Sequence, residues 1–173
     1  AIGGVTSVET AADGLTTTLN AYGMSAADAG RVSDLLFVGM KQGKTTIEEM
    51  STSIGAVATI AAQTGVGLDE LIAATATLTK SGIATSEAMS GIKGVLSAVM
   101  KQSPQAVAMA EKMGVGFNIA AIESEGFASW LAKVQEATGG SAEKLAKLFG
   151  RVEGLTAVMS LGAEGGAEYN RIL

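Results

Sequence analysis

Apolar residues recur along most of the chain at the spacing of one face of an α-helix. Positions three or four residues apart form a stripe that faces the core when the segment is helical. The stripes are Val32, Leu35, Leu36, Gly39 and Met40; Ile47, Met50, Ile54, Val57, Ala58 and Ala61; Leu68, Leu71, Ile72, Thr75 and Leu78; Met89, Ile92, Leu96, Val99 and Met100; Phe127, Trp130, Leu131 and Val134; and Leu145, Leu148 and Phe149. The best extended candidate, Val115–Ile122, has only a weak strand pattern. The sequence therefore predicts an all-α protein.

Residues that start and stop helices lie at the ends of these stripes. Ser25, Thr46 and Ser141 each precede an acid two or three residues later, and Ser103 precedes Pro104. A Ser or Thr oxygen can accept a hydrogen bond from a free N–H of the first turn, and proline suits the first helical position. Glycines, which tolerate the left-handed conformation after a helix, stand at positions 23, 43, 65, 82, 114 and 139. We expect short helices joined by Gly-capped turns into helical hairpins or a bundle.

The same signals predict four parts of the chain. We expect residues 1–22 to be the end of an upstream helix and residues 23–114 to be a region of helical hairpins. A short irregular connector is expected at 115–125, and residues 126–173 are expected to be C-terminal helices of the same domain. The chain starts at Ala1 and is expected to be a piece of something longer. Small residues four apart permit close helix crossings, and the pairs are Gly39 and Gly43, Gly150 and Gly154, and Gly162 and Gly166.

Composition removes several classes of site. The 173 residues include no cysteine and no histidine, which excludes Cys/His zinc sites, Ser–His and Cys–His nucleophiles, iron–sulfur clusters and disulfides. Twelve basic against 17 acidic residues give a net charge of −5, which argues against a specific nucleic-acid site because such sites need clustered positive charge. Aromatic residues are only 4% while glycine occurs 23 times. The core is therefore expected to consist of small side chains and closely approaching backbones.

The sequence contains only fragments of active-site patterns. Gly39–Thr45 resembles a phosphate loop, but three rather than four residues separate its glycines and a helical segment precedes it. Ser90–Lys93 and Ser141–Lys144 match Ser-x-x-Lys without the accompanying motifs. Three acid pairs could be proposed as paired carboxylates for glycoside cleavage. They are Glu48 and Glu49, Asp69 and Glu70, and Glu123 and Glu125, of which the first two lie in first helical turns. Acids in a first turn favour the helix dipole, so we assign no catalytic, cofactor-binding or metal-binding residue and no cofactor.

Two further sets of residues favour packing or solvation. The basic cluster Lys133, Lys144, Lys147 and Arg151 is interleaved with Glu136, Glu143 and Glu153, which is typical of a salt-bridged surface. Most methionines occupy stripe positions and are expected in the core, although methionine also suits adaptable surfaces; they are Met24, Met40, Met50, Met89, Met100, Met109, Met113 and Met159. The uncharged run Met50–Leu68 is laced with Ser, Thr and Gln, which favours a buried helix over a membrane span.

Five short segments of the sequence, in the same order, resemble the conserved region of phage tail tape measure proteins. They are Asn20–Asp34, Thr45–Met50, Ala61–Leu71, Ser81–Ile83 followed by Ala88–Lys93, and Leu148–Arg151, which together cover roughly residues 10–160. The resemblance implies a structural protein rather than an enzyme, and it carries over no catalytic residues. It implies a chain that sets tail length, supports tail assembly and assists genome ejection. The chain lacks the long heptad-rich measuring region of whole family members.

The same resemblance implies binding partners and a location. The partners are other copies of the chain, as a trimer or hexamer, the tail tube protein, tail assembly chaperones and distal tail or baseplate hub proteins. The place is the tail tube lumen or tip of the virion, and the host cytoplasm during assembly. Two other classes stay open. One is a membrane-inserting module, in which Met50–Leu68 and Gly94–Met100 contact the host membrane on ejection and form a DNA-translocation channel. The other is a lysozyme-like enzyme, for which no placed acid pair is found.

Overall fold

The computed structural model describes residues 7–150 and 152–173, and within them every regular element is a helix. The all-α prediction is confirmed. The α-helices are α1 (Val8–Ala21), α2 (Ala29–Gln42), α3 (Ile47–Ile54), α4 (Ala58–Gln63), α5 (Leu68–Lys80), α6 (Thr85–Lys101), α7 (Pro104–Met113), α8 (Ile119–Glu125), α9 (Phe127–Thr138), α10 (Ala142–Phe149), α11 (Val152–Leu161) and α12 (Ala167–Ile172), with 3₁₀ turns η1 (Ala26–Asp28) and η2 (Ala163–Gly166).

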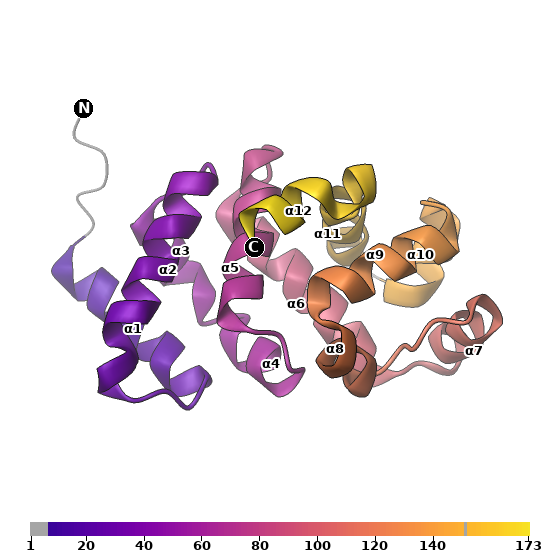
Figure 1. The fold of residues 1–173 in the computed structure, drawn as a ribbon, viewed down its shortest axis with the longest axis horizontal. Coiled ribbons are helices and arrows are strands. Elements are labelled where there is room, and N and C mark those ends of the chain that lie inside the picture. Colours follow the sequence, from indigo (N-terminus) through magenta and orange to yellow (C-terminus); the bar gives the residue numbers. More distant parts are fainter. Residues whose placement is uncertain (1–6, 151) are drawn as a thin grey trace.

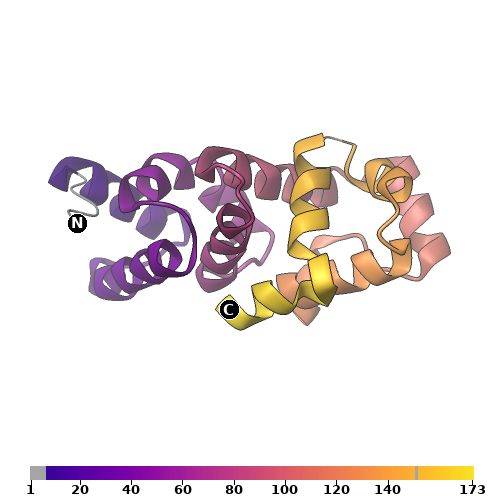
Figure 2. The same cartoon turned by 90° about the horizontal axis from the view of Figure 1, so that it is seen from above.

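The helices form an elongated body. Helices α1–α3 lie at one end of the long axis, α5 and α6 occupy the middle, and α7 and α10 lie at the opposite end (Figure 1). The C-terminal helix α12 returns to the middle and lies beside α5, which the second view also shows (Figure 2). The closest helix pairs are α6 with α11, α1 with α3 and α2 with α5. The two ends of the body are therefore built from different parts of the sequence.

Capping residues begin several helices as the sequence predicts. Thr46 accepts a hydrogen bond from the Glu49 N–H at 3.1 Å, and the Glu49 carboxylate accepts from the Thr46 N–H at 3.1 Å. Ser103 accepts from the Ala106 N–H at 3.2 Å, with Pro104 as the first residue of α7. Such reciprocal bonds satisfy N–H groups that have no partner inside the helix.

Glycine ends most of the predicted helices in the left-handed conformation. Positive φ angles occur at Gly23, Gly65, Gly82, Gly114 and Gly139 among others. Gly43 is different, because its φ is −95°. A Cβ at Gly43 would lie 2.9 Å from the Cα of Ala76 and 2.5 Å from the Thr79 hydroxyl. Gly43 is therefore required by the close approach of α2 to α5, and its prediction as a left-handed cap is wrong.

The core combines closely packed backbones with one aromatic cluster. Residues 71–79 of α5 are all buried, and its buried threonines donate to carbonyls of their own helix, as Thr75 does to Leu71 at 2.9 Å. This internal bonding lets polar side chains lie in a dry interior. The aromatic cluster joins α9 to the loop before α8, to α10 and to α12, and its members are Phe117, Phe127, Trp130, Phe149 and Tyr169.

Three predictions about segment boundaries require correction. Helix α1 begins at Val8, with Ser7 as its N-cap, so residues 8–21 are a complete helix and not the end of an earlier one; residues 1–6 lie outside the described part. Residues 119–125 of the predicted irregular connector, including most of the weak strand candidate, form α8. The Asn118 side chain caps this helix by accepting from the Ala121 N–H at 2.8 Å. The grouping of 23–114 with 126–173 into one domain stays a prediction.

The uncharged run Met50–Leu68 is the third correction, since it is not one helix. It is divided between the end of α3, a turn, α4 and the loop before α5. The break at residues 55–57 allows Ile54 and Val57 both to be completely buried. No helix in the described part of the chain has the length and apolar character needed to cross a membrane.

Candidate functional site

The acid pair Asp69 and Glu70 lies at the start of α5, where Glu70 serves as a structural link. One carboxylate oxygen of Glu70 accepts from the Gly67 N–H at 3.2 Å, and the other accepts from the Phe127 N–H at 2.7 Å. Glu70 thus caps α5 and also the start of α9, which lies 57 residues later in the sequence. A carboxylate with both oxygens occupied by backbone donors is suited to holding helices together rather than to proton transfer.

Two tyrosines lie close to this acid pair. The Tyr169 hydroxyl donates to the Glu70 carbonyl at 3.0 Å, whereas the buried Tyr22 hydroxyl has no hydrogen-bond partner. Burial raises the pKa of both hydroxyls above the usual value, and the carboxylates of Asp69 and Glu70 act in the same direction. Both tyrosines therefore stay protonated at neutral pH, and neither can act as a base.

The other acid pairs have different surroundings. Glu49 accepts from the hydroxyls of Thr45 and Thr85 at 3.3 and 3.2 Å, which ties the start of α3 to the start of α6. Glu48 is exposed, and Glu123 lies on the surface of α8. Glu125 forms an ion pair with Lys133 at 2.9 Å. These carboxylates do not converge on a common space, and the described residues contain no group of acids that could hold a metal ion.

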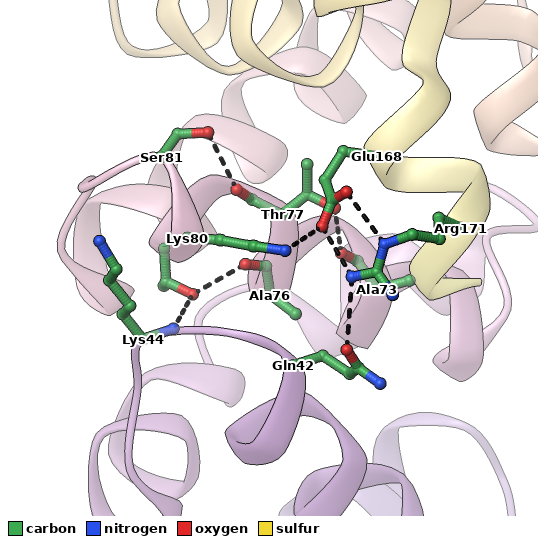
Figure 3. A network of polar contacts seen from close by, with 10 residues as sticks. Gln42, Lys44, Ala73, Ala76, Thr77, Lys80, Ser81, Glu168 and Arg171 are labelled. Carbon is green, nitrogen blue, oxygen red and sulfur yellow. Dashed lines mark hydrogen bonds and ion pairs between the residues drawn. The ribbon is translucent and has the colours of Figure 1, made fainter.

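A polar network fastens α12 to the middle of the body (Figure 3). Glu168 accepts from Lys80 at 2.6 Å and from two nitrogens of Arg171 at 2.7 and 3.0 Å. Arg171 reaches Gln42 on α2 at 3.4 Å. Hydrogen bonds from Arg171 and Lys80 lower the pKa of Glu168 to about 2. Because these side chains are partly exposed, each ion pair contributes little by itself, and the network positions α12 rather than forming a reactive site.

The phosphate-loop and Ser-x-x-Lys candidates are ordinary helix boundaries and surfaces. Lys44 follows the end of α2, and its backbone N–H donates to the Thr79 hydroxyl at 3.2 Å. Ser141 is the N-cap of α10 and accepts from the Lys144 N–H, while Ser90 and Lys93 are exposed on α6. None of these arrangements places a nucleophile beside a base.

The predicted salt-bridged surface is confirmed for two of its lysines. Lys147 pairs with Glu143 one turn away on α10 at 2.7 Å, and Lys133 pairs with Glu125. Arg151 and the side chain of Glu153 lie outside the described part of the chain. Of the methionines, Met50 and Met89 are buried as predicted, whereas Met100 and Met159 are 43% and 42% exposed.

An open groove lined by charged residues lies between α6 and α10. It has a volume of about 790 Å³. Ala98, Leu148 and Phe149 contribute apolar lining, and Lys93, Lys101 and Lys147 contribute three positive charges. Among the described residues that line it, Glu143 is the one acid, and it is paired with Lys147. The described residues that line the groove thus carry more basic than acidic side chains.

Comparisons with known proteins agree with a structural role. A family described as phage-related minor tail protein matches residues 1–164. The tape measure protein of Pneumococcus phage Dp-1 is 25% identical over 164 residues, a match that covers 91% of this chain. The chain spans 14% of the length of that relative. No solved structure gives a significant match. Because the family match extends over nearly the whole chain, the protein belongs to the family of phage-related minor tail proteins and is a component of a phage tail.

Proposed function

We propose that this chain is a segment of a tape measure protein, which sets the length of a phage tail, supports tail assembly and assists genome ejection. The observation that carries the proposal is the match to the family over residues 1–164, together with similarity to a protein named as a tape measure protein. The proposed partners are further copies of the chain, the tail tube protein, tail assembly chaperones and the distal hub. The proposed places are the tube lumen or tip of the virion, and the host cytoplasm during assembly.

The ruler function proposed for the parent chain requires extended helix rather than the folded body of this segment. A helix rises 1.5 Å per residue, so 173 helical residues laid end to end would reach about 260 Å. In the folded body the same residues are divided into short helices by glycine turns. A helical chain converts a number of residues into a length in direct proportion, which is the property that a molecular ruler requires.

Tail length in a phage that encodes this chain tests the proposal. Helical spacers of about 25 and about 50 residues, inserted directly after this segment in the parent gene, should lengthen tails by about 38 and 75 Å. A deletion of about 50 residues beside the segment should shorten tails by about 75 Å. Electron microscopy of purified particles measures the length. Tails of unchanged length in all three mutants would refute the ruler function, and a change that does not follow the number of residues would do so as well.

A further inference from the structure

We infer that the α6–α10 groove of one copy of the chain binds the outer face of α1 of a second copy. Helix α1 lies at one end of the long axis and α10 at the opposite end, with α6 between them (Figure 1). This inference deepens the proposal that copies of the chain contact one another, and it rests on that proposal for its place in the tail. The contact itself is a property of the chain alone.

The groove presents two lysines that no acid of the described residues neutralises, while its third lysine, Lys147, is paired with Glu143. Lys93 and Lys101 are exposed, lie two turns apart on α6, and take part in no ion pair within the described part of the chain. Lys147 faces the same groove from α10. The half-buried Ala98 adds apolar surface beside these lysines. The groove therefore favours an occupant that has acidic and apolar side chains on one face.

The outer face of α1 has this composition. Val8 and Ala12 lie one turn apart and form an apolar strip, and Glu9 and Asp13 form an acidic strip beside it. All four residues are exposed, and Val8 is the most exposed large apolar residue that the structure describes, at 87%. The helices that pack on α1 contribute two basic residues, Arg31 and Lys41 of α2. Glu9 and Asp13 form no ion pair within the described part of the chain. The α1 face thus carries unneutralised negative charge at the end of the body remote from the groove.

Opposite charges on different ends of one molecule favour contacts between molecules. Within a single copy the two surfaces are held apart by the length of the body (Figure 2). A second copy can bring its α1 face to the groove, where the lysines meet Glu9 and Asp13 and the apolar strip covers Ala98. Complementary charge of this kind raises the association rate and fixes orientation, and its effect falls with ionic strength.

Sedimentation velocity of the purified 173-residue chain tests this contact. We expect self-association that grows with protein concentration at about 20 mM NaCl and weakens at about 300 mM NaCl. The double variant K93E/K101E should weaken association by about tenfold or more. The matched control K41E/K44E makes the same change of net charge on exposed lysines outside the groove, and it should associate like the unmodified chain.

A charge swap separates the contact from any effect on folding. The variant E9K/D13K should also lose self-association, whereas an equimolar mixture of E9K/D13K with K93E/K101E should associate, because each end then meets an oppositely charged partner. Circular dichroism should show unchanged helix content in both variants. A chain that stays monomeric at low salt, association that survives K93E/K101E, or a mixture that does not associate would each overturn the inference. Such a result would leave the tail-length experiment unaffected, so the two proposals can fail separately.

Discussion

Replacing Gly14 by alanine is predicted to destabilise the crossing of α1 with α3. A Cβ at this position would lie 2.6 Å from the Cα of Ser51 and would also overlap the Ser51 side chain. Non-bonded carbon atoms are most stable about 3.5–4.0 Å apart. Because the Ser51 Cα belongs to the backbone, no side-chain rotation relieves the overlap, and the two helices must move apart by about 1 Å.

The expected change in the free energy of unfolding results from two opposing effects. Overpacking of a close contact costs about 1–3 kcal/mol. Alanine in a helix is more favourable than glycine by about 0.5–1 kcal/mol. The Ser51 hydroxyl, which is buried without a hydrogen-bond partner, offers no bond that the separated helices would lose. We therefore expect Gly14→Ala to lower the free energy of unfolding by about 1–2 kcal/mol.

Urea denaturation measures this change, with circular dichroism reporting all helices and Trp130 fluorescence reporting the aromatic cluster. Coincident transitions would establish that unfolding is two-state and that the free energies can be compared. Gly30→Ala is the matched control, since a Cβ at Gly30 in α2 meets no atom within 4 Å; it should be neutral or stabilising. If Gly14→Ala is as stable as Gly30→Ala, the reasoning from close backbone approach is refuted.

Three further outcomes are expected. Glu70→Ala removes the acceptor of the Phe127 N–H and should lower the free energy of unfolding by about 1–3 kcal/mol in urea denaturation; a neutral effect would contradict the linking role of Glu70. Hydrogen bonds from Arg171 and Lys80 lower the folded pKa of Glu168 from the usual 4.5 to about 2, so its contribution to stability is present above pH 4.5 and is lost as the pH falls toward 2. The melting temperatures of the unmodified chain and Glu168→Gln should therefore differ at neutral pH and converge in acid, and a constant difference would refute this assignment. Trp130→Ala removes a completely buried ring whose indole N–H donates to Gly116 at 2.7 Å, and should cost about 3–5 kcal/mol by thermal or urea unfolding; a loss below about 1 kcal/mol would contradict the central place of the aromatic cluster.

Local signals in the sequence predicted the helices better than their boundaries. The stripe Leu68–Leu78 correctly marks α5, yet the helix is buried on all sides because α2, α6, α11 and α12 also contact it. The break between α3 and α4 has one local signal, Gly55, which is the C-cap of α3. No proline or charge interrupts the run from Met50, and the turn at 55–57 is stabilised by burial of Ile54 and Val57 against residues distant in sequence.

Contacts between distant segments account for what the sequence did not predict about the site. Glu70 was recognisable as an acid in a first helical turn, but its bond to the Phe127 N–H joins segments 57 residues apart. The Tyr169 hydroxyl reaches the Glu70 carbonyl across 99 residues. Gly43 was recognised as a glycine at a helix end, yet its role depends on Ala76 in α5. Each residue type was visible in the sequence, while its partner was defined only by the fold.

The two ends of the body are stabilised in different ways, which bears on how copies can meet. The aromatic rings gather around α9, where Phe117 and Phe149 lie 5.6 Å apart between ring centres and bury large apolar surfaces. At the other end, α1 packs on α2, α3 and α4 and crosses α3 closely where Gly14 meets Ser51, and its outer face is exposed. A helix attached on one side can contact a second copy without disturbing the core. Gly14→Ala should therefore weaken the proposed self-association in sedimentation velocity as well as lower the free energy of unfolding. The reason is that the added Cβ moves α1, and with it the acidic residues Glu9 and Asp13, away from α3.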